Sequence, residues 1–240
     1  MASMRFLLVG VTSASLLALP TTATATTPAG IASSQPSTSA ATTSSRFNTD
    51  VRFLNFDHIR SFAETVRIKG QVVATVNKDT GAVAGVRVSL HRKLSGSSRW
   101  VRLDATSTNQ RRYPSFTFRT RARANASYRV VFAGNARLQP SRSVTGVRVH
   151  RRFNAQLEDG SGRFHGRVVP RYSHRVVYLA KRRCAECSWR TVAHTRTGDR
   201  GRYSFKVGAP RSGRYYWRLR TPRSVRYIRS YSGVFTTERR

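Results

Sequence analysis

Hydrophobic and polar residues alternate along most of the chain after residue 46. The run Val86–Arg92 reads V-R-V-S-L-H-R, Phe116–Arg119 reads F-T-F-R, and Tyr215–Arg220 reads Y-Y-W-R-L-R. A period of two places alternate side chains on opposite faces of a β-strand, one face in a core and the other in water. Turn-forming sequences such as Ser95–Ser97 and Ser212–Gly213 separate these runs. The pattern therefore predicts many short antiparallel strands, and no stretch after residue 25 shows the period of a helix.

One stretch of this pattern occurs twice. Val86–Phe118 aligns without gaps on Arg175–Val207, 89 positions later. The matching pairs include Val88 with Val177, Leu90 with Leu179, Trp100 with Trp189, Thr106 with Thr195, Thr108 with Thr197, Arg111 with Arg200, Ser115 with Ser204 and Phe116 with Phe205. The shared residues are of the types that build a β-sheet core, and no catalytic residue type is among them. The alignment predicts two copies of one sheet unit.

Each copy lies in a segment of roughly 90–105 residues with about seven short strands, which is typical of a β-sandwich. The two segments begin with similar sequences, Arg46–Asn48 and Arg152–Asn154. We therefore expect two tandem domains, at residues 46–150 and 151–240. The junction Val147–Phe153 contains no glycine or proline, so we expect one strand to run straight into the next in a semi-rigid tandem.

Three stretches resemble a known family. Gly85–Arg92, Ser98–Leu103 and Ser127–Asn135 resemble the immunoglobulin-like β-sandwich repeats of secreted and cell-wall-associated actinobacterial proteins. Such repeats carry a V-x-V-x-L strand, a tryptophan in the next strand, and a late Y-R-V-x-F-A-G strand. The resemblance covers Val66–Val149 well and Gly166–Phe235 more loosely. It implies an all-β fold of two tandem immunoglobulin-like antiparallel β-sandwich domains, and it specifies no activity.

The first 45 residues differ from the rest. Arg5, the apolar run Phe6–Leu19 and the small residues Ala23–Ala25 are typical of a signal peptide, which we place at residues 1–25. A signal anchor or a buried helix is the alternative, although the apolar run is too short to span a bilayer as a stable helix. Residues 26–45 are mainly Thr, Ser, Ala and Pro, which favours a disordered linker. We therefore expect a secreted, extracellular protein without a transmembrane segment.

Charge narrows the class of partner. The chain has 44 Lys and Arg residues against 10 Asp and Glu residues, a formal charge of +34, and loss of Arg5 with a signal peptide leaves +33. Such a surface accumulates polyanions and releases them as salt rises. Only Glu158 and Asp159 are adjacent acids, and the six histidines are scattered, which argues against a calcium cage or another metal site. We expect no metal and no cofactor.

Cys184 and Cys187 form the only reactive-looking motif. A redox C-x-x-C pair favours a helix N-terminus, and a zinc site needs two further ligands; neither accompanies this motif. The alignment places the two cysteines on Ser95 and Ser98, in the loop of a predicted hairpin. Because export exposes thiols to oxidation, we predict a disulfide across that loop.

Trp100 and Trp189 occupy the same position in the two copies. Strand parity places each tryptophan on the face opposite the core, where an aromatic ring beside arginine could contact a sugar or a base. The alternative is that the ring turns inward and covers the end of the core.

Arginine and aromatic residues interleave near the C-terminus. The outward-facing residues of this run form a cationic ladder suited to phosphate or carboxylate polymers, and the alternative is an ordinary solvated strand face. The candidate polyanion-binding residues are Arg214, Tyr216, Arg218, Arg220, Arg223, Arg226 and Arg229.

Motifs of enzymes are missing from the sequence. It contains no G-x-S-x-G, no H-E-x-x-H and no phosphate-binding loop. We therefore expect a non-catalytic secreted protein that associates with anionic cell-envelope polymers through its arginine-rich surface. An extracellular nucleic-acid or other polyanion binder is the alternative, and an exported hydrolase or inhibitor is a third hypothesis.

Overall fold

The computed structural model describes residues 46–238, which belong to one compact unit. The predicted signal peptide (1–25) and linker (26–45) lie outside the described residues. Among residues 46–238, strands connected by turns account for the regular structure, and a 3₁₀ turn at Asp199–Gly201 is the only helical element. The all-β prediction is confirmed.

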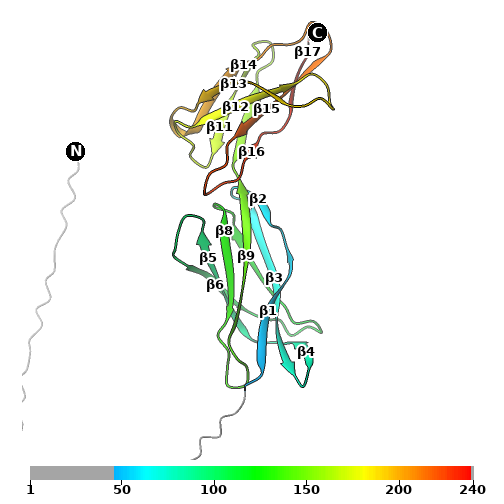
Figure 1. Cartoon of the computed structure of the whole chain (residues 1–240), viewed down its shortest axis with the longest axis vertical. Coiled ribbons are helices and arrows are strands. Elements are labelled where there is room, and N and C mark those ends of the chain that lie inside the picture. Colours follow the sequence, from blue (N-terminus) through cyan, green and yellow to red (C-terminus); the bar gives the residue numbers. More distant parts are fainter. Residues whose placement is uncertain (1–45, 239–240) are drawn as a thin grey trace, which may run out of the picture. The chain divides into compact units, whose positions relative to one another are not determined.

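Two sheets form from residues 48–150 (Figure 1). The strands of the first sheet are β1 (Asn48–Phe56), β3 (Thr65–Val76), β4 (Asp79–Ala82) and β7 (Phe116–Arg121). The second sheet has the order β2 (Ile59–Ser61), β9 (Ser141–His150), β8 (Ala126–Phe132), β5 (Arg87–Leu94) and β6 (Val101–Ser107). All pairs are antiparallel except β2 with β9, which is parallel.

Residues 152–238 form two further sheets. The first contains β10 (Arg152–Leu157), β11 (Arg163–Val169) and β14 (Arg202–Lys206). The second has the order β13 (Arg190–Arg196), β12 (Val176–Arg182), β15 (Arg214–Thr221) and β16 (Ser230–Tyr231), with β17 (Phe235–Glu238) also paired to β15. We call this last sheet the β12–β15 sheet.

The strand order is immunoglobulin-like in both halves. An immunoglobulin-like sandwich places its first, second and fifth strands in one sheet and its third, sixth and seventh in the other. Here β1, β3 and β7 oppose β5, β8 and β9, while β10, β11 and β14 oppose β12, β15 and β16. The immunoglobulin-like β-sandwich fold is thus confirmed. Corresponding strands also share their register, because Val88 pairs with Thr106 and Val177 pairs with Thr195.

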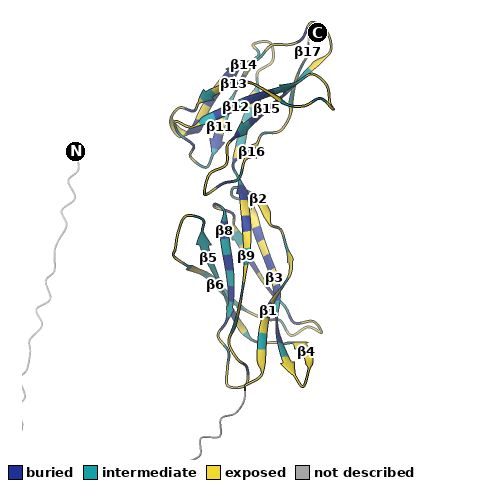
Figure 2. Ribbon diagram, viewed as in Figure 1, coloured by how far each residue is buried: buried dark blue, intermediate teal, exposed yellow. Residues whose placement is uncertain are grey.

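Buried apolar side chains, which alternate with exposed ones along the strands, hold each pair of sheets together. Along β8, Tyr128, Val130 and Phe132 are buried while the residues between them are partly exposed, and β3 alternates in the same way (Figure 2). One core contains the apolar residues of β3, β5, β7 and β8, and a second contains Phe164, Leu219 and their neighbours. Each fully buried aliphatic or aromatic side chain stabilises the fold by about 1.5–3 kcal/mol.

The threonines shared by the two copies have a structural role. Thr108 is 2% exposed and its hydroxyl donates to the carbonyl of Val83 at 2.7 Å and accepts from the amide of Val86 at 3.1 Å. Thr197 is 1% exposed; its hydroxyl donates to the carbonyl of Tyr172 and accepts from the amide of Arg175. In each copy one hydroxyl satisfies the backbone groups that precede a core strand.

The β3–β4 hairpin has a two-residue turn. Val76 pairs with Asp79, so Asn77 and Lys78 form the turn. Both turn residues have positive φ, 48° and 74°. Two-residue hairpin turns require this conformation because it matches the twist of the flanking strands.

The loop at residues 222–229, between β15 and β16, contacts the chain near the end of β9. The amide of Ile228 donates to the carbonyl of Val149 at 3.0 Å, and the hydroxyl of Tyr227 donates to the carbonyl of Arg123 at 2.7 Å. Tyr227 is itself part of the first core. Arg151 is the single residue between β9 and β10, which agrees with the absence of a glycine or proline linker at this junction.

Candidate anion-binding surface

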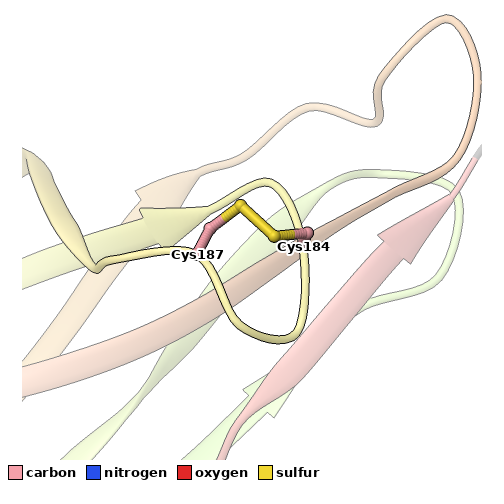
Figure 3. The surroundings of a disulfide bond; sticks show 2 residues. All are labelled: Cys184 and Cys187. Atoms are coloured by element: carbon pink, nitrogen blue, oxygen red, sulfur yellow. A yellow bond between two sulfur atoms is a disulfide. The ribbon is translucent and has the colours of Figure 1, made fainter.

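The disulfide lies in the hairpin loop that the sequence predicted. Cys184 and Cys187 are joined between β12 and β13, with their Cα atoms 5.1 Å apart (Figure 3). The amide of Cys187 also donates to the carbonyl of Cys184 at 3.3 Å. The motif sits in a loop without a helix, so the bond closes the end of the hairpin. The predicted disulfide is confirmed.

The outer side of the β12–β15 sheet carries interleaved arginines and aromatic rings. We call it the arginine–aromatic face, and its members are Tyr178, Arg182, Trp189, Tyr216, Arg218, Arg220 and Tyr231. Strand pairing brings them together, because Tyr178 lies opposite Arg220 and Arg182 lies opposite Tyr216. The intervening residues Trp217 and Leu219 point into the core, with 5% and 0% exposure. The period of two therefore sorts core residues from surface residues along β15.

Each arginine of the face lies over at least one ring. The guanidinium carbons of Arg182 and Arg218 lie 4.7 and 4.4 Å from the ring centre of Trp189. Arg218 also lies 4.2 Å from the ring centre of Tyr231. Cation–π contacts of this kind are worth about 0.5–2 kcal/mol each, according to their exposure.

Two further contacts extend the face along the sheet. Arg182 lies 5.1 Å from the ring centre of Tyr216, and Arg220 lies 4.4 Å from that of Tyr178. Cation–π contact fixes the guanidinium but leaves its positive charge unneutralised. The arginines are therefore held in place with their charge available to a partner.

Carboxylates do not neutralise this face. Among residues 46–238 the ion pairs of arginine are with Asp50, Asp57 and Glu238, and none includes Arg182, Arg218 or Arg220. Burial against the rings lowers the pKa of Arg218, and the neighbouring arginine charges lower it further. An arginine remains charged at neutral pH even so. Charge of one sign is thus concentrated on a partly desolvated surface.

The first half of the chain has a smaller version of the same arrangement. The amine of Lys93 and the guanidinium of Arg129 lie 5.2 and 4.4 Å from the ring centre of Trp100. Lys93 and Arg129 stand 89 positions before Arg182 and Arg218, as Trp100 does before Trp189. Both tryptophans are half-buried on the outer side of their sheets, so neither ring turns inward to cover a core.

The candidate arginines separate into three groups. Arg218 and Arg220 lie on the face with Tyr216 and Trp189. Arg214 is paired with Glu238 through a 2.6 Å contact between its Nε and a carboxylate oxygen, and this hydrogen bond raises its pKa. The remaining three, Arg223, Arg226 and Arg229, are exposed in the loop after β15 and do not belong to the arginine–aromatic face.

Sequence reasoning missed three members of the face, Tyr178, Arg182 and Tyr231. A signal for Arg182 was present, because the 89-residue offset places Lys93 on Arg182 within the aligned stretch. The same offset continues beyond Val207 and places Arg129 on Arg218, so the central arginine of the C-terminal run has a counterpart in the first half. Tyr178 and Tyr231 required knowledge of which strands are neighbours.

No family model and no curated protein matches this chain. Solved structures resemble it weakly. The human OSCAR ligand-binding domain is 16% identical over 80% of this chain and 100% of that chain, with a TM-score of 0.28. The chicken interferon gamma receptor alpha chain is 10% identical over 78% of this chain and 97% of that chain, with a TM-score of 0.40.

A superoxide reductase (neelaredoxin) from Ignicoccus hospitalis is 11% identical over 42% of this chain and 80% of that chain, with a TM-score of 0.33. No ligand or activity is carried over from these likenesses. Among residues 46–238, no helix has the length and apolar character needed to cross a membrane. The strand order of the described residues establishes their fold, an immunoglobulin-like β-sandwich in each half.

Proposed function

We propose that this chain is a non-catalytic binding protein for anionic polymers and that the arginine–aromatic face of the β12–β15 sheet is its binding surface. The observation that carries the proposal is the set of ring-held arginines without a carboxylate partner, Arg182, Arg218 and Arg220. Arginine offers planar, bidentate donors to phosphate and carboxylate groups. Rings that immobilise it reduce the entropy lost on binding.

The polymer class follows from what the rings contact. Guanidinium groups already lie over Trp189 and Tyr178, so those rings are poorly placed to stack on bases. Binding then depends mainly on contacts between the arginine charges along the strands and the anionic groups of the polymer. This favours a phosphodiester or carboxylate polymer of the cell envelope over single-stranded nucleic acid, which is held by base stacking as well as by phosphate contacts.

Location belongs to the same proposal. The Cys184–Cys187 disulfide is of a kind that persists in oxidising compartments. The signal-like sequence at residues 1–25 and the polar stretch at 26–45 support export and a tether that holds the sandwiches near the wall. A cell-wall-associated protein of actinobacterial type is the form that we propose.

The test compares two double variants that remove the same charge. R218Q/R220Q changes the face, and R67Q/R119Q removes two exposed arginines that are paired across β3 and β7. Affinity for poly(glycerol phosphate), which has phosphodiesters and no bases, is measured from 50 to 300 mM salt. With about 0.7 in slope per phosphate contact, the face variant should flatten the slope of log K against log salt by roughly 1.4.

Equal loss in the two double variants would show that net charge alone, not the face, governs binding. A (dT)₂₀ oligonucleotide provides the second comparison. Affinity for the oligonucleotide that exceeds affinity for poly(glycerol phosphate) tenfold at matched charge would favour the nucleic-acid function instead.

A further inference from the structure

A groove of about 860 Å³ beside Arg151 is lined by arginine on several sides. It lies among the turn after β11, the ends of β12 and β13, and the loop after β15. The arginines that line it are Arg151, Arg171, Arg175, Arg196, Arg223 and Arg226. No Asp or Glu is among the lining residues. We call it the arginine groove.

Arg151 is built into the floor of this groove. Its side chain is only 9% exposed, and its guanidinium carbon lies 4.6 Å from the ring centre of Tyr172 and 4.1 Å from that of Tyr227. Nη2 donates to the hydroxyl of Ser224 at 3.3 Å, whereas Nε and Nη1 are buried without a hydrogen-bond partner. A buried charge with unsatisfied donors is costly, and here the rings compensate only part of that cost.

The rim of the groove holds further arginines in place. The Nε of Arg171 donates to the hydroxyl of Ser173 at 3.3 Å, and Nη1 of Arg196 donates to the carbonyl of His174 at 3.4 Å. Arg175 and Arg223 are exposed. Burial lowers the pKa of Arg151, and the charge of Arg175 lowers it further. Like charges that converge on one concavity repel each other unless a counter-ion occupies it.

We propose that the arginine groove binds a compact oligophosphate, a ligand with two or more linked phosphate groups. The volume falls within the usual range of small-molecule sites, about 300–1,000 Å³. A single phosphate offers few acceptor oxygens to the six arginines that line the groove, while linked phosphates carry enough charge and acceptor oxygens for several bidentate contacts. None of the arginines of the arginine–aromatic face lines the groove, and Tyr178 alone belongs to both surfaces; the arginines of this site are thus distinct from those proposed to bind the polymer.

Titration calorimetry with sodium tripolyphosphate at 50 mM salt tests the site on the chain with residues 26–240. Wild type should bind one equivalent, and inorganic phosphate should bind at least tenfold more weakly. R175Q/R223Q, two exposed positions, should raise Kd at least tenfold. The charge-matched R67Q/R119Q control should change Kd by less than threefold.

Arg151 needs a separate variant because it is buried. R151K keeps the charge but loses the planar fork and the ring contacts, so it should weaken tripolyphosphate binding while circular dichroism shows an intact β fold. Absence of saturable heat, full binding by R175Q/R223Q, or equal losses in the two double variants would overturn the site.

The source of the phosphates is resolved by competition. An oligonucleotide with a 5′-triphosphate that displaces tripolyphosphate, when the 5′-hydroxyl form does not, identifies the ligand as a polymer end. If neither oligonucleotide displaces it, the groove accepts free oligophosphate. Both outcomes retain the site, and displacement by the 5′-hydroxyl form with equal potency would contradict it.

Discussion

Replacing Thr197 by valine should destabilise the second half of the chain without changing its shape. The side chain is 1% exposed, and its hydroxyl donates to the carbonyl of Tyr172 and accepts from the amide of Arg175 at 3.1 Å. Valine fills the same volume but offers neither a donor nor an acceptor. Both backbone groups then lose the hydroxyl that pairs with them.

The size of the effect follows from those two groups. Each buried polar group that loses its partner costs about 1–3 kcal/mol. Arg175 is exposed, so water can replace the hydroxyl on that side, and we expect a total of about 2–3 kcal/mol. Residues 46–238 belong to one compact unit, and for 150–250 residues about 2–4 °C accompanies each kcal/mol. The melting temperature should therefore fall by roughly 4–12 °C.

Urea and thermal unfolding of T197V measure this change, with T197S and T191V as controls. Serine retains the hydroxyl, and Thr191 is an exposed residue of β13. Both control variants should remain within about 0.5–1 kcal/mol of wild type. If T197V and T191V have the same free energy of unfolding, the hydroxyl of Thr197 does not stabilise the fold through the backbone groups that it contacts. T108V provides the same test in the first half.

Three other changes have defined outcomes. G70A should cost about 1–3 kcal/mol by overpacking, because a Cβ there would lie 2.5 Å from a backbone oxygen and from a phenylalanine ring; G81A, with nothing within 4 Å, is the control in urea unfolding. Burial lowers the pKa of His91 from its usual 6.5, and the charges of Arg129 and Arg102 lower it further. The free energy of unfolding should therefore decrease as pH falls below 6.5, and H91Q should reduce this dependence on pH. C184S/C187S should lower stability by at most about 2 kcal/mol, since the closed loop is short, and a larger loss in urea unfolding would contradict a local role.

Much of the fold can be predicted from the sequence because the chain has both a two-residue alternation and a repeat at an offset of 89 residues. The alternation in Val86–Arg92 identifies strands, and the 89-residue offset identifies corresponding strands in the two halves. Parity also separates Trp217 and Leu219, which are buried, from Arg218, which is not. These are local properties of a strand, so one sequence is enough to show them.

The remaining features depend on which strands are neighbours. Tyr178 meets Arg220 only because β12 pairs with β15, and Arg214 is paired with Glu238 only because β17 returns beside β15. The arginine groove likewise combines Arg151, which lies between β9 and β10, with the loop at residues 222–229. Periodicity contains no information about such contacts, so Arg151 gave no signal in the sequence.

The most direct measurement of the central claim follows the indole signals of the three tryptophans, Trp100, Trp189 and Trp217. In ¹H–¹⁵N spectra recorded during titration with poly(glycerol phosphate), the Trp189 signal should shift saturably, because its ring contacts Arg182 and Arg218. Trp217 is 5% exposed and donates to Thr237 at 2.9 Å, so its signal should stay. Polymer binding that leaves the Trp189 signal unmoved would contradict the assignment of the arginine–aromatic face as the binding surface.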